Sequence, residues 1–61
     1  MMAGQVKIRL QGLPDDVTKT AVALRALMRV LEESDDYPNR GNSGFVRRYL
    51  VVIPEPPKEN Q

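Results

Sequence analysis

The chain has 61 residues, no cysteine, no histidine and a net charge of +1. This length corresponds to one small domain with a marginal core, because a chain of about 60 residues buries only about 60% of the surface that it exposes when unfolded. The composition excludes disulfides and zinc sites built from thiolates or imidazoles. Self-association and close packing therefore remain as the ways to stabilise the domain.

Domain limits and location follow from simple patterns. Residues 1–53 are predicted to form a single domain, and residues 54–61 a flexible, proline-rich tail. No apolar run approaches the roughly 20 residues that span a bilayer, and the first residues lack the basic start and apolar core of a signal peptide. We therefore expect a cytoplasmic protein with no membrane association.

The first predicted element is a strand over residues 6–10. Val6, Ile8 and Leu10 alternate with Lys7 and Arg9. Such alternation is typical of a strand with one buried face, and it directs the two cations away from the core.

A helix is predicted next, over residues 14–28, because Pro14 suits the first helical turn and Asp15 and Asp16 suit the positive end of the helix dipole. Its apolar side chains recur at spacings of four, three, four and three: Val17, Ala21, Leu24, Met28 and Leu31. The pattern does not determine where the helix ends. Residues 29–34 either continue it or form a second strand, and a strand over 30–34 is favoured because two strands cover a helix poorly.

Residues 35–44 are dense in turn formers and predict a loop, and residues 45–53 carry the strongest strand signal in the chain. One face of that strand carries Phe45, Arg47, Tyr49, Val51 and Ile53, and the other carries Val46, Arg48, Leu50 and Val52. A strand that is apolar on both faces is usually covered on both. The helix covers one face, which the pattern does not identify, and another molecule is expected on the other.

These elements predict an α+β fold of β-α-β-β type, with one helix packed on a three-stranded sheet. The first crossover is expected to be right-handed, so that the first two strands run parallel. The last strand then returns between them, which gives the order 1-3-2 and half of a ferredoxin-like sheet. The sheet face opposite the helix is left open.

Catalysis is not expected, because the chain lacks the His and Cys side chains that usually activate a nucleophile. Four acids crowd one short stretch and are best interpreted as solvated surface: Glu32, Glu33, Asp35 and Asp36. A calcium loop read from Asp35 fails, because Arg40 stands where a glycine is required. No metal, cofactor or small-molecule substrate is predicted.

Nucleic-acid binding is the alternative function, since cations beside an aromatic side chain on an open sheet can hold phosphates and stack bases. The candidate residues are Lys7, Arg9, Arg40, Arg47 and Arg48, with Tyr49 beside them. The net charge of +1 weighs against this function. Pairing of Arg47 with Glu32 or Glu33, with Tyr49 in the core, would also explain these residues.

The favoured function is a non-enzymatic interaction module that forms a homodimer through its sheet. The residues predicted to mediate self-association are Phe45, Tyr49, Val51 and Ile53. On an open face they would form an apolar patch that is large for so small a domain. Two copies can bury it face to face, or can pair their edge strands.

Three segments resemble a group of short bacterial proteins of unassigned function. They are KIRLQGLP at residues 7–14, YPNRG at residues 37–41 and VRRYL at residues 46–50. The resemblance implies a bacterial or mobile-element setting and the same order of strand, helix, strand and strand. It implies no activity and no functional residue.

Overall fold

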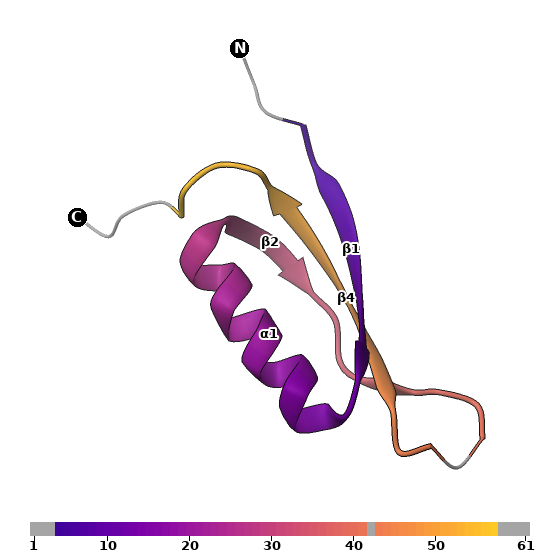
Figure 1. The fold of residues 1–61 in the computed structure, drawn as a ribbon. Coiled ribbons are helices and arrows are strands. Elements are labelled where there is room, and N and C mark those ends of the chain that lie inside the picture. Colours follow the sequence, from indigo (N-terminus) through magenta and orange to yellow (C-terminus); the bar gives the residue numbers. More distant parts are fainter. Residues whose placement is uncertain (1–3, 42, 58–61) are drawn as a thin grey trace.

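The computed structural model describes residues 4–41 and 43–57, which form one helix packed on an antiparallel sheet (Figure 1). In chain order the elements are β1 (Val6–Gly12), α1 (Pro14–Leu27), β2 (Arg29–Glu33), β3 (Tyr37–Pro38) and β4 (Val46–Ile53). The predicted α+β class is confirmed. Within the described part of the chain, no helix is long and apolar enough to cross a membrane.

The long strand β4 lies at the centre of the sheet. It pairs antiparallel with β1 on one side and with β2 on the other, so that β1 and β2 run in the same direction. The sheet has one strand more than the three predicted. The additional strand, β3, lies within the segment predicted as a loop and also pairs with β4. The sequence of β3 does not predict a strand, because the element has only two residues and one of them is a proline. Its pairing with Arg47 and Val46 is what defines it.

The ends of α1 follow the local chemistry of the chain. Pro14 occupies the first turn, and the Val17 N–H donates to the carbonyl oxygen of Leu13 at 2.9 Å. The helix ends at Leu27, one residue earlier than predicted, because Met28 is already extended while its N–H donates to the Leu24 carbonyl at 2.8 Å. The chain passes directly into β2, so residues 29–33 are strand, and the alternative of a longer helix is wrong.

The core between α1 and the sheet is small. Among the described residues four apolar side chains are buried: Val17, Ala21, Leu50 and Val52. Around them pack the partly buried Ile8, Leu10, Leu24, Met28 and Val30. Leu50 and Val52 therefore identify the face of β4 that the helix covers. The alternate side chains of β4 point to the other side of the sheet.

A bulge in β2 decides which acids lie on which side of the sheet. Val30 stands opposite Val52, but the register then shifts, so that Glu32 stands opposite Val51 and Glu33 opposite Leu50. Directly opposed residues in paired strands share a face. Glu32 therefore lies on the side away from the helix, whereas Glu33 lies on the helix side.

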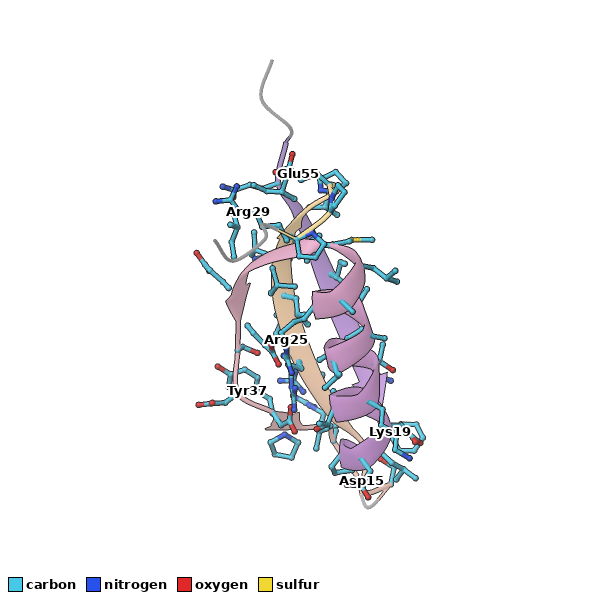
Figure 2. All side chains as sticks on the ribbon, turned by 90° about the vertical axis from the view of Figure 1, so that its left-hand side faces the viewer. Asp15, Lys19, Arg25, Arg29, Tyr37 and Glu55 are labelled. Carbon is cyan, nitrogen blue, oxygen red and sulfur yellow. The ribbon has the colours of Figure 1, made fainter. Side chains whose placement is uncertain are left out.

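The chain after β4 returns to the start of β2. The Glu55 N–H donates to the Ile53 carbonyl at 2.7 Å, and the Arg29 N–H donates to the Glu55 carbonyl at 3.1 Å. The side chains of Arg29 and Glu55 also form an ion pair of 3.6 Å (Figure 2). Glu55, in the first part of the predicted flexible tail, is thus attached to the sheet. Residues 58–61 of that tail lie outside the described residues.

Candidate binding surface

Among the described elements α1 is the only helix, and it packs on one side of the sheet (Figure 1). The other side of the sheet is the open face. Cross-strand pairing arranges the side chains of the open face in rows. Lys7 and Glu32 flank Val51, and Arg9 stands beside Tyr49. A third row consists of Gln11, Arg47 and Tyr37.

A hollow of about 500 Å³ lies on the open face. The residues that line it include Lys7, Glu32, Tyr37, Arg47, Tyr49 and Val51. They come from all four strands, which are distant in sequence and are brought together by β4. The hollow therefore combines two cations, an acid and two aromatic rings around the aliphatic side chain of Val51.

Arg47 links the β3 segment to the centre of the open face. Its guanidinium lies over the ring of Tyr37, with the Cζ atom 5.9 Å from the ring centroid. The Nη1 atom donates to the Pro38 carbonyl oxygen at 3.1 Å and to the Asn39 Oδ1 atom at 3.2 Å. The alternative in which Arg47 pairs with Glu32 or Glu33 is wrong, because its acceptors are neutral groups of Pro38 and Asn39.

The two tyrosines of the hollow form an aromatic pair. The ring centroids of Tyr37 and Tyr49 are 6.3 Å apart, and the ring planes are tilted by 52°. This is a favourable arrangement for two aromatic rings. Tyr37 remains 45% exposed, so part of this aromatic pair is accessible at the surface.

Arg48 lies on the helix side of the sheet, in a network of acids. Its Nε and Nη2 atoms donate to the two carboxylate oxygens of Asp36 at 2.6 and 3.1 Å. Its Nη1 atom donates to the Glu33 Oε2 atom at 2.7 Å, and its Nη2 atom donates to the Thr18 hydroxyl at 3.2 Å. Glu33 also forms an ion pair with Arg25 of α1. The Arg48 side chain, only 13% exposed, thereby joins the helix, β2 and the segment before β3.

The network shifts the ionisation of its members. Burial by itself would raise the pKa of Glu33, but hydrogen bonds and charge from Arg25 and Arg48 together hold that pKa below its ordinary value. The hydrogen bond from Arg48 lowers the pKa of Asp36, and the same bond raises the pKa of Arg48. Both acids are therefore charged at neutral pH, as the paired state requires.

The structure separates the residues that were predicted to bind nucleic acid. Lys7, Arg9 and Arg47 share the open face, and the exposed Arg40 lies in the segment after β3. Arg48 does not join them, because it is on the other side of the sheet and is held by Asp36 and Glu33. The candidate set is therefore reduced to four cations.

Three of the four residues predicted to mediate self-association share the open face. Tyr49, Val51 and Ile53 occupy alternate positions of β4 on the open face, while the exposed Phe45 lies just before the strand. Sequence reasoning missed Tyr37 and Glu32 as members of this surface. The pairing of β3 and the bulge in β2 bring them there, and neither feature has a clear sequence signal.

Comparison of the chain with protein-family models, with curated proteins and with solved structures gives no match. The half-ferredoxin-like description of the fold and the resemblance to short bacterial proteins therefore stay predictions.

Proposed function

We propose that this protein is a small non-enzymatic interaction module that forms a homodimer through the open face of its sheet. The observation that supports the proposal is the second face of the central strand, which no described helix covers. Tyr49, Val51 and Ile53 lie there partly exposed, with Tyr37 beside Tyr49, although the core beneath the helix is very small. Burying that face against a second copy would add apolar contacts that one chain cannot supply.

The size of the face sets the expected affinity. Three strands about 4.8 Å apart and about 20 Å long present roughly 300 Å² in projection. With the relief of the side chains included, two stacked faces would bury roughly 1,000 Å² in total, which is below the standard size of a specific interface. We therefore expect a reversible dimer with a Kd of about micromolar magnitude.

The Tyr49→Asp substitution is expected to convert this dimer into a folded monomer. An aspartate at the centre of an apolar interface would lose its hydration without gaining a partner. In the monomer the same carboxylate stays in water, on a face that also carries Lys7, Arg9 and Arg47. Sedimentation equilibrium or light scattering over a range of concentrations measures the change in mass, and far-UV circular dichroism reports the fold.

The matched control is Val22→Asp on the exposed side of α1. Val22 is 52% exposed, and valine and aspartate have similar helix propensities. This variant should retain the wild-type dissociation constant at both low and high salt, because its new charge lies away from the sheet. A Tyr49→Asp protein that is folded and still dimeric would refute the proposed interface.

Nucleic-acid binding remains a second candidate because of one arrangement on the same face. The exposed ring of Tyr37 lies under the Arg47 guanidinium, and Lys7 and Arg9 project from the neighbouring strand β1. Aromatic rings and cations on an open sheet can stack bases and contact phosphates. The net charge of +1 leaves this candidate behind the dimer.

Fluorescence anisotropy with a labelled single-stranded oligonucleotide tests the second candidate. If the open face binds phosphates, affinity should fall steeply as salt rises, and the Lys7→Gln and Arg9→Gln variants should each weaken binding several-fold. Lys19→Gln, an identical loss of charge on α1, should have little effect. Absence of a salt-dependent change in anisotropy at low ionic strength would remove this candidate.

A further inference from the structure

We propose that the two copies stack with their twofold axis parallel to the strands, so that β1 of each copy lies over β2 of the other. The inference rests on the proposed self-association and adds the orientation of the partner. It follows from the distribution of charge across the open face, which is asymmetric from one edge of the sheet to the other.

In the row of Val51 the two edges of the open face carry opposite charges, and Arg29, the cation of β2 on the same face, is paired with Glu55. Val51 of the central strand is paired with Lys7 of β1 on one side and with Glu32 of β2 on the other. The three side chains therefore form one row across the sheet. Both charged residues line the hollow. Within the described residues neither forms an ion pair, whereas Glu33, one position further along β2, is paired with Arg25 and Arg48.

Aligned stacking of two identical sheets leaves two orientations of the twofold axis. An axis perpendicular to the strands places β1 over β1, so that the cations Lys7 and Arg9 lie over the same strand of the other copy, and an axis through the Val51 row sets Lys7 on Lys7 and Glu32 on Glu32. An axis parallel to the strands exchanges the edges, so that Lys7 of each copy meets Glu32 of the other. Like charges in a closely packed interface are costly, and opposite charges are not. A parallel axis also places the backbone of Arg47 over that of its copy, but each guanidinium is held toward Tyr37, Pro38 and Asn39 at the β3 edge, so the two lie at opposite edges of the stack. The charges of the Val51 row therefore select the parallel axis.

The centre of the same row fits this orientation. Val51 lies midway between the two charged residues and would contact Val51 of the second copy, with the Tyr49 rings beside it. The result is an apolar centre with charged side chains at the rim, which is the usual composition of an interface. Rim charges of this kind set the orientation of a partner more than they raise its affinity.

Charge reversal of single residues tests the orientation. In the proposed dimer, Lys7→Glu brings two glutamates together at two symmetry-related places, and Glu32→Lys likewise brings two lysines together. We expect each variant to dissociate about tenfold more readily than the wild type. An equimolar mixture of the two variants should form a heterodimer with an affinity close to that of the wild type, because both contacts become complementary. Sedimentation velocity and native mass spectrometry measure these species.

The mixture separates contacts between copies from effects within one chain, since a repulsion inside the chain would not be relieved by a second variant on another molecule. Lys19→Glu on α1 makes the same change in net charge and should leave the dimer unaffected. Wild-type affinity in both single variants, or no recovery in the mixture, would overturn the orientation. A wild-type protein that stays monomeric at all concentrations would instead overturn the proposed self-association itself.

Discussion

Replacing Leu50 with alanine is expected to unfold a large fraction of the protein at 25 °C. Leu50 is fully buried at the centre of a core that contains only three other buried apolar side chains among the described residues. A buried Leu→Ala change costs about 2–5 kcal/mol. A 61-residue domain has a free energy of unfolding of roughly 3–9 kcal/mol in total. The expected loss is therefore comparable to the whole stability.

Leu27→Ala provides the matched control for this experiment. Leu27 is 67% exposed at the end of α1, and alanine is at least as good a helix former as leucine. Urea denaturation followed by circular dichroism should give a midpoint close to that of the wild type for Leu27→Ala and a greatly lowered midpoint for Leu50→Ala. Equal midpoints for the two variants would show that the packing of α1 on β4 has been misassigned.

Acid should destabilise the protein through the Arg48 network, and the Arg48→Met variant should lose much of this acid sensitivity. Glu33 and Asp36 have lower pKa values in the folded chain than their ordinary values of 4.5 and 3.8. A group with a lowered pKa stabilises the fold above its unfolded pKa, and this contribution disappears as the pH falls through the folded pKa. The Tm of the wild type should therefore fall when the pH drops from about 5 to about 2.

In the Arg48→Met protein the guanidinium is absent, so Glu33 loses one of its two cationic partners and Asp36 loses its only one within the described residues. Its Tm should be lower at pH 7, and the further fall in acid should be smaller than in the wild type. Arg47→Met is the control, because the hydrogen-bond acceptors of Arg47 are neutral. That variant should show the full acid effect. An equally large acid effect in Arg48→Met would mean that the network does not cause it.

The sequence by itself determined most of the secondary structure, because those signals are local. The alternation of Val6, Ile8 and Leu10 predicts β1, and Pro14 followed by two acids predicts the start of α1. The density of β-branched and aromatic side chains from residue 45 onward predicts β4, which begins one residue later at Val46. The central place of β4 between the other long strands also agrees with the simple topology rules.

The candidate surface, by contrast, depended on features that are not local. Alternation divides the side chains of β4 into two faces, but both are apolar, so only the packing of α1 on Leu50 and Val52 decides which one is left open. Glu32 and Glu33 point to opposite sides of the sheet because they are neighbours in a strand, but only the one-residue register shift at the bulge in β2 decides that Glu32 is the one on the open face.

The same limit applies to the two adjacent arginines of β4. In sequence Arg47 and Arg48 are equivalent candidates for a basic surface. In the folded chain one contacts Tyr37 and neutral acceptors on the open face, and the other is enclosed by Asp36, Glu33 and Thr18. Their partners come from residues 8 to 30 positions away along the chain. Local patterns thus determined the helix and the main strands, whereas only the tertiary structure decided which charged side chains lie on the open face and which are enclosed by opposite charges.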